Sequence, residues 1–159
     1  MANEIFYKDV APTALTATAG TLADQTAVLL GLMDLRGAGS VANLILNFEM
    51  IADILCKFTT ITGIIARKVV ADLYLVPAVD GTNFADVDTT SGASYIPSNY
   101  RVGSFIAPFQ FVTATNVRMA TAQFDAYPLK YNAYLQNVAG QTMTAGAVVT
   151  IAPARVQYT

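Results

Sequence analysis

Four carboxylate and amide side chains occur in one short segment of the sequence, DGTNFADVD (80–88). Carboxylate and amide oxygens of this kind bind hard cations such as Ca²⁺. The calcium loop of an EF-hand, however, has acidic residues at alternate positions and a glycine at the sixth, and DGTNFADVDTTS lacks this pattern. Asp and Asn also favour turns, because their side chains bond to their own backbone. We therefore prefer a turn to a metal site for these residues, which are Asp80, Asn83, Asp86 and Asp88.

Catalysis has few candidate residues. The chain contains no histidine, which removes Ser-His-Asp and Cys-His chemistry and every histidine-ligated metal. The single cysteine, Cys56, has no imidazole partner and no disulfide partner, and its neighbours ILCKF indicate a buried, inert thiol. Asp86 and Asp88 are the one carboxylate pair close in sequence that hydrolysis would require. GAGS (37–40) lacks the lysine and the glycine spacing of a phosphate loop. We expect no enzymatic activity and no cofactor.

Aromatic side chains gather in the middle of the chain. Exposed aromatics stack against sugars in carbohydrate-binding β-sandwiches, so a sugar platform is one interpretation. Aromatics also dominate cores and interfaces, and we favour that interpretation. The residues are Tyr95, Tyr100, Phe105, Phe109 and Phe111.

The composition indicates a protein whose surface is largely covered. The 159 residues fit one domain. Hydrophobic residues make up 54% and charged residues 13%, against about 25% charged in ordinary soluble domains. Polar and charged residues interrupt the most apolar stretch (41–66), which argues against a membrane span, and MANEIFYKDV does not resemble a signal peptide. The net charge is −2 with scattered basic residues, so we expect no nucleic-acid binding. We therefore assign the apolar excess to contacts between subunits.

The periodicity is mostly that of β-strands. Apolar and polar residues alternate in 43–50, 69–76 and 129–137, which predicts half-buried antiparallel strands. Further strands are expected at 104–112, at 116–124, and at 146–158 with a break near Pro153; Pro108 predicts an edge strand or a bulge in the first of them. Segment 26–35 fits either a helical turn or a strand.

Gly, Pro, Asn and Asp clusters separate these segments, a pattern typical of an all-β sandwich or barrel. The Ala/Thr-rich start holds at most one short strand near 15–18 and otherwise reads as an arm. We predict an N-terminal arm over 1–25 and a β-sandwich domain over 26–159.

Two stretches carry a resemblance to a known family. VADLYLVPAVDGTNFADVD is a strand running into a DGTN turn, and PLKYNAYLQNVAGQTMTAGAVVTIAP is a strand, an Asn-x-x-Gly turn and a final apolar strand. In this order, over residues 69–159, they resemble the jelly-roll decoration (cement) proteins of tailed-bacteriophage capsids. The stretch 51–68 is more apolar than this family leads us to expect. The resemblance implies a jelly roll of about eight antiparallel strands behind an extended N-terminal arm.

The resemblance also implies a function. Such a structural protein binds the outer surface of a capsid that has assembled in the host cytoplasm, often as a homotrimer, and bridges major capsid subunits. Phe6 and Tyr7 are then the expected apolar interface anchors of an arm over residues 1–12. The alternative is a glycan- or receptor-binding β-sandwich of a phage tail or an adhesin.

Overall fold

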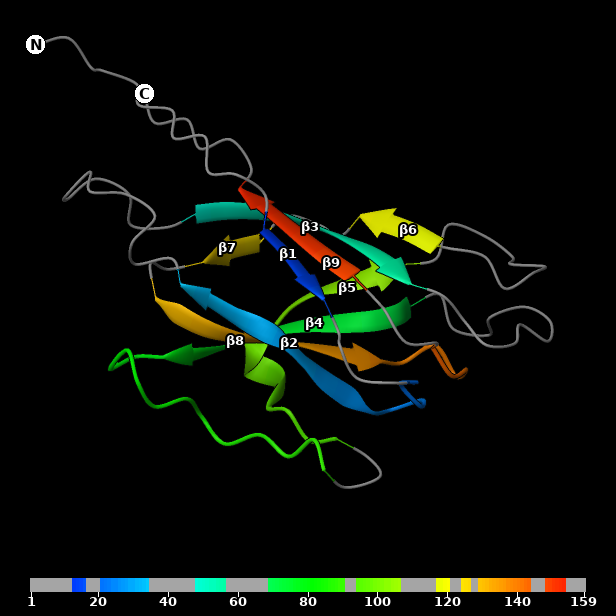
Figure 1. Ribbon diagram of the computed structural model, residues 1–159, viewed down its shortest axis with the longest axis horizontal. Helices are drawn as coiled ribbons and strands as arrows, with labels where there is room; N and C mark the ends of the chain where they lie inside the picture. Colours follow the sequence, from blue (N-terminus) through cyan, green and yellow to red (C-terminus); the bar gives the residue numbers. More distant parts are fainter. Residues whose placement is uncertain are drawn as a thin grey trace, which may run out of the picture.

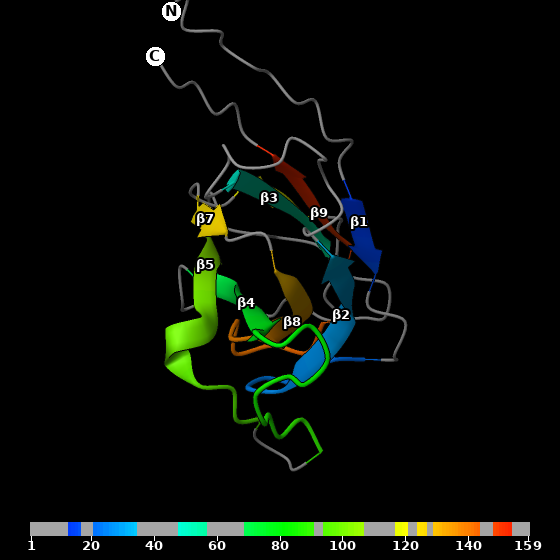
Figure 2. The same ribbon diagram turned by 90° about the vertical axis from the view of Figure 1, so that its left-hand side faces the viewer.

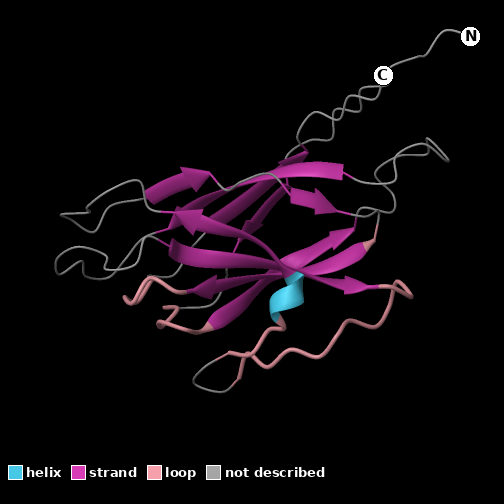
Figure 3. Cartoon of the chain, turned by 180° about the vertical axis from the view of Figure 1, so that it is seen from behind, coloured by secondary structure: helices cyan, strands magenta, loops and turns pink. Residues whose placement is uncertain are grey.

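The fold is built almost entirely of strands. The computed structural model describes residues 13–16, 21–34, 48–56, 69–90, 94–106, 117–120, 124–126, 129–143 and 148–153. These residues form nine strands and one turn of 3-10 helix, η1 (Ser98–Tyr100) (Figure 3). The strands are β1 (Thr13–Thr16), β2 (Ala27–Asp34), β3 (Phe48–Cys56), β4 (Val69–Ala78), β5 (Arg101–Ile106), β6 (Val117–Ala120), β7 (Phe124–Ala126), β8 (Lys130–Asn137) and β9 (Val148–Pro153). The all-β prediction is confirmed for this part of the chain.

The strands form two antiparallel sheets that lie one above the other (Figures 1 and 2). One sheet has the order β1-β9-β3-β6, with β7 also paired to β3, and the other has the order β2-β8-β4-β5. Strands β1 and β2 contact each other at one side of the two layers, and β5 contacts β6 and β7 at the other. Each layer can therefore bury its inner face against the other.

The strand pairs are nested along the sequence. β4 pairs with β5, β3 with β6 and β7, β2 with β8, and β1 with β9, all antiparallel. The pairing is that of one long antiparallel hairpin. Successive parts of its two arms lie alternately in one sheet and in the other. Thr13 lies opposite Ile151, so the chain enters β1 and leaves β9 at the same corner of the fold.

Most sequence-predicted strands are present. The predicted strands at 69–76 and 129–137 correspond to β4 and β8, and the ambiguous segment 26–35 is strand β2. β9 is described from Val148 to Pro153, and residues 154–158 of the predicted strand lie outside the described residues. As expected, β5 lies at an edge of its sheet, with two register shifts against β4. Pro108 lies outside the described residues.

Two strand predictions need correction at their ends. The strand predicted at 43–50 is described from Phe48 and continues to Cys56, six residues farther than the alternation suggested. The short strand predicted near 15–18 is β1, Thr13–Thr16. β1 and residues 22–25 belong to the predicted arm, yet they are hydrogen-bonded into the sheets; residues 1–12 lie outside the described residues.

The core lies between the two sheets, and a second set of buried residues lies on the outer face of the β2-β8-β4-β5 sheet. Leu73 and Leu75 of β4 are buried and alternate with Tyr74 and Val76, which pack against the connection on the outer face, so they lie on the face toward the other sheet. Val149 and Ile151 of β9 are 0% and 2% exposed, and burying each such side chain contributes roughly 1.5–3 kcal/mol. Half-burial of β4 was the expectation, but every residue from Val70 to Val76 is buried. The outer face of β4 is covered by the connection that follows the strand.

Candidate functional site

The longest described connection in the fold crosses the outer face of the β2-β8-β4-β5 sheet. We call residues 79–90 and 94–100, the described parts of the link between β4 and β5, the strap (Figures 1 and 2). Asp88 and Tyr95 form an antiparallel bridge within the strap, with hydrogen bonds of 2.9 and 2.7 Å between their backbones. The strap then closes with η1, where Tyr100 N–H donates to Pro97 O at 3.1 Å. These bonds give the connection a defined shape without a strand partner in either sheet.

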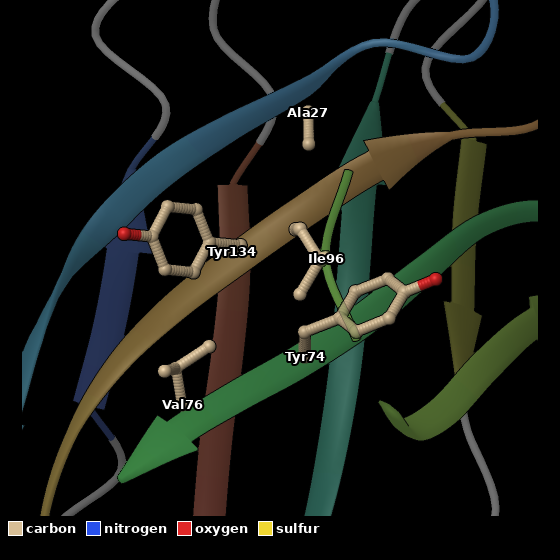
Figure 4. Packing of buried hydrophobic residues seen from close by; sticks show 5 residues of the cluster. All are labelled: Ala27, Tyr74, Val76, Ile96 and Tyr134. Atoms are coloured by element: carbon tan, nitrogen blue, oxygen red, sulfur yellow. The ribbon is translucent and has the colours of Figure 1, made fainter. Parts of the chain in front are cut away.

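Ile96 anchors the strap to the sheet. Its side chain is 7% exposed and packs in one cluster with Ala27, Tyr74, Val76 and Tyr134, which come from β2, β4 and β8 (Figure 4). Four half-buried strap side chains add to this cluster: Phe84, Ala85, Val87 and Tyr100. An isoleucine from the strap therefore buries the alternate, even-numbered face of β4, which the periodicity assigns to solvent.

Ser94 ties the strap to the edge of the sheet. Ala27 N–H donates to Ser94 Oγ at 2.8 Å, and Ser94 N–H donates to the backbone oxygen of Gln25 at 3.1 Å. Among the described strands β2 lies at the edge of its sheet, so Ser94 gives the Ala27 N–H a partner on the open side, while Gln25 O, just before β2, also accepts from Gln136 Nε2 at 3.3 Å. Such bonds satisfy groups that would otherwise remain open for pairing with another chain.

A polar cluster lies on the same outer face, beside the strap. Asp72, 8% exposed, accepts a hydrogen bond from Ser104 Oγ at 2.5 Å, and its second oxygen lies 3.7 Å from Arg101 Nη1. Next to it, Tyr74 Oη donates to Gln136 Oε1 at 2.9 Å. Burial raises the pKa of Tyr74; the nearby Asp72 carboxylate raises it further, while Arg101 opposes the shift. Through these contacts the cluster joins β4, β5 and β8.

The DGTN segment is a hydrogen-bonded turn. Asp80 Oδ1 accepts from the N–H groups of Thr82 at 2.8 Å and Asn83 at 2.7 Å, and Oδ2 accepts from Asn83 Nδ2 at 2.7 Å. Gly81 has φ +80°, which a residue without Cβ adopts freely. The N–H groups of Asn83 and Thr82 hold the pKa of Asp80 below its usual range. The turn interpretation of this segment is confirmed.

An open pocket of about 440 Å³ lies beside this turn. It lies between the end of β4 and η1, and its walls combine polar groups of the turn with apolar and aromatic side chains. The lining residues are Pro77, Val79, Asp80, Asn83, Phe84, Ala85 and Tyr100.

The other predicted ligands of a cation do not join Asp80. Asp88 Oδ1 accepts from the backbone and hydroxyl of Thr90, at 2.8 and 2.9 Å, which forms a separate turn. Asp86 is exposed on the strap between the two turns. Among the described residues, no group of three His, Cys, Asp or Glu side chains is placed to hold a metal ion.

The structure separates the five aromatic candidates. Phe105 is completely buried, Tyr95 is 67% exposed, and Tyr100 is half-buried at the pocket. The shared sugar platform is therefore wrong for Phe105, whose position in β5 points its ring into the core. Phe109 and Phe111 lie outside the described residues.

Two further predictions fall outside what the structure describes. The proposed interface anchors Phe6 and Tyr7 lie in residues 1–12. Cys56 is the last residue of β3, opposite Val117, but its side chain is not among those described.

Sequence reasoning missed the residues that hold the strap. Ile96 and Ser94 lie in a polar, turn-rich stretch with no periodicity, and Phe84 follows the DGTN turn directly. The single signal in the sequence was an isolated apolar residue before a proline, Ile96-Pro97, in an otherwise polar loop.

Comparison with known proteins identifies no relative. No family model matches the chain, and no curated protein or solved structure matches it either. Among the described residues, no helix has the length and apolar character needed to cross a membrane.

Proposed function

We propose that the chain is a jelly-roll decoration protein that binds the outside of an assembled tailed-phage capsid and bridges major capsid subunits. The nested strand pairing carries the fold half of this proposal. A jelly roll has eight strands in two sheets. Because β6 and β7 both pair with β3, we count them as two halves of one strand. The nine described strands then reduce to eight, four in each sheet.

The functional half rests on the resemblance and on the surface, because one fold can host many functions. Large apolar side chains are exposed at several places on the described surface, and charged residues make up 13% of the chain. A surface of this kind suits burial against neighbouring subunits. The exposed residues, with exposed fractions of 45–80%, are Leu29, Leu32, Val79, Tyr95 and Ile106.

Binding alone would account for the stabilising effect. A protein that binds the assembled shell and not the free subunits shifts the equilibrium toward the shell by mass action. A homotrimer multiplies the contacts that one copy makes. The entry and exit of the chain at one corner support an arm over residues 1–12 that reaches a neighbour, with Phe6 and Tyr7 as its apolar contacts.

The test combines three measurements. The native mass of the purified chain should be that of a trimer. The chain should co-sediment with capsids of the virus that encodes it, and those capsids should withstand a higher temperature when it is bound. Deleting residues 2–12 should lower capsid occupancy, while the matched double variant Phe6→Ala/Tyr7→Ala shows how much of the loss comes from the two aromatic residues. A chain that neither co-sediments nor protects capsids is not a decoration protein.

A further inference from the structure

The pocket beside the DGTN turn presents a fixed set of hydrogen-bonding groups. An ionised carboxylate offers about four acceptor sites. Asp80 uses three of them within its own turn, two on Oδ1 and one on Oδ2. Because Asp80 is exposed, Oδ2, which accepts only the Asn83 amide in the turn, is accessible to a ligand. Asn83 keeps its second amide N–H and its carbonyl oxygen, since the bond to Asp80 takes only one N–H.

These remaining groups place donor and acceptors side by side. A hydroxyl group both donates and accepts a hydrogen bond. One hydroxyl of a ligand can therefore donate to Asp80, while the neighbouring hydroxyl accepts from the amide N–H of Asn83 or donates to its carbonyl oxygen. An anionic ligand is disfavoured by the charge on Asp80, which its turn bonds keep ionised. A simple cation would use the acceptors alone and leave the amide N–H of Asn83 unused.

The rest of the pocket is apolar. Phe84 and Tyr100 line it together with Pro77 and Val79. Both rings also pack against the cluster around Ile96, so they are held in place before any ligand arrives, which lowers the cost of binding. Polar groups and aromatic rings in one pocket fit a ring that has hydroxyls at its edge and C–H groups on its face.

We propose that this pocket binds a neutral saccharide, with Asp80 and Asn83 on adjacent hydroxyls and Tyr100 and Phe84 against the sugar ring. The site does not depend on capsid binding and lies on the strap, on the outer side of the β2-β8-β4-β5 sheet. A chain bound to a shell through another face would still present it.

The experiment uses the full chain and a defined panel of sugars. Saturation-transfer NMR with glucose, galactose, mannose and N-acetylglucosamine detects weak binding, and glucuronate serves as the anionic comparison. Asn83→Ala and Tyr100→Ala should each weaken binding of the preferred neutral sugar about three- to tenfold, the usual loss for one hydrogen bond or one aromatic contact. Tyr95→Ala, which removes an exposed tyrosine outside the pocket, should leave binding unchanged.

Each outcome decides the proposal. Binding of a neutral sugar that Asn83→Ala weakens and Tyr95→Ala does not supports it. Because Asn83 is exposed, this variant keeps its core, and unchanged thermal unfolding confirms that it is folded. The proposal is overturned if no neutral sugar in the panel binds, if glucuronate binds more tightly than the neutral sugars, or if Asn83→Ala and Tyr100→Ala both bind as the unaltered chain does.

Discussion

Asn137 Nδ2 donates a 2.9 Å hydrogen bond to the backbone oxygen of Leu22, 115 residues earlier in the chain. The same nitrogen donates to Gln141 O at 2.6 Å, and Asn137 Oδ1 accepts from Ala139 N–H at 3.0 Å. The side chain is completely buried. One amide group therefore joins the segment before β2 to the turn between β8 and β9. Next to it, Gly140, with φ +75°, donates its N–H to Asp24 Oδ1 at 2.8 Å.

Replacing Asn137 with alanine should destabilise the protein strongly. The change removes three hydrogen bonds and leaves the buried Ala139 N–H without its partner, although Leu22 O still accepts from Met143 N–H at 2.9 Å. The expected loss in the free energy of unfolding is about 2–4 kcal/mol. Urea unfolding followed by circular dichroism measures it. Asn99→Ala is the matched control, since Asn99 is exposed in η1. Equal stability of the two variants would show that the junction contributes little.

Removing the strap anchor should loosen the outer face of the sheet. Ile96→Ala deletes buried methyl groups, and we expect a loss of about 1–3 kcal/mol, below the usual range for a central core site because the strap can settle into the space. Amide hydrogen exchange should increase in the strap and at the β2 edge near Ala27. Ile106→Ala, at a side chain that is 55% exposed, should change stability by less than about 0.5 kcal/mol. Unchanged exchange in the strap of Ile96→Ala would mean that Ile96 does not anchor it and that its other contacts, including the hydrogen bonds of Ser94, are sufficient.

The sequence predicts those parts of the fold that depend on neighbouring residues, and not those that depend on residues far apart in the chain. Alternation in 69–76 and 129–137 is a local signal, and both strands are present. The same alternation predicts a solvent-facing side for β4, and here it is wrong, because the cover is supplied by Ile96, twenty residues beyond Val76. Nothing near Tyr74 in the sequence indicates that partner. β3 extends to Cys56 through IADILC, a mostly apolar stretch interrupted by Asp53 that periodicity alone does not assign to a strand.

The candidate pocket likewise has one wall that the sequence predicts and one that it does not. Its Asp80–Asn83 wall is a local turn, and the residue types predict it. Its Tyr100 wall depends on how the strap returns to β5, which places residues twenty apart on one pocket. The sequence groups Tyr100 with Phe105 and Tyr95, but neighbouring positions on the strap and β5 face in different directions.

Alkaline pH should destabilise the protein partly through Tyr74. Its pKa is raised above the ordinary 10.0, chiefly by burial. As the pH rises, the unfolded chain therefore loses the hydroxyl proton of Tyr74 before the folded chain does. The contribution of Tyr74 to the free energy of unfolding is complete below about pH 10 and decreases as the pH rises above it. Burial raises the pKa of Tyr134 as well, opposed by its hydrogen bond with Asn132. Tyr74→Phe should cost about 0.5–1.5 kcal/mol at neutral pH through the lost bond to Gln136, and should show a shallower decline in alkali.

The measurement is urea unfolding at a series of alkaline pH values. The double variant Tyr74→Phe/Tyr134→Phe should flatten the decline further than either single change. Tyr95→Phe is the control at an exposed site and should follow the unaltered chain. A decline that is equally steep in the double variant would assign the alkaline effect to other groups.

Acid should act through Asp80 in the opposite direction. Its pKa lies below the ordinary 3.8 because the N–H groups of Asn83 and Thr82 stabilise the carboxylate. A group whose pKa is lowered by folding stabilises the protein above its unfolded pKa, and this contribution is lost as the pH falls through the folded pKa. Asp80→Asn should therefore lower stability at neutral pH, and the difference from the unaltered chain should shrink as the pH falls below about 3.8. Asp86→Asn, at an exposed residue of the same strap, is the matched control, and NMR titration of the Asp80 carboxyl gives the shift directly. A stability difference for Asp80→Asn that stays constant down to strongly acidic pH would show that the carboxylate charge does not hold the turn, and that the amide in its place makes the same bonds.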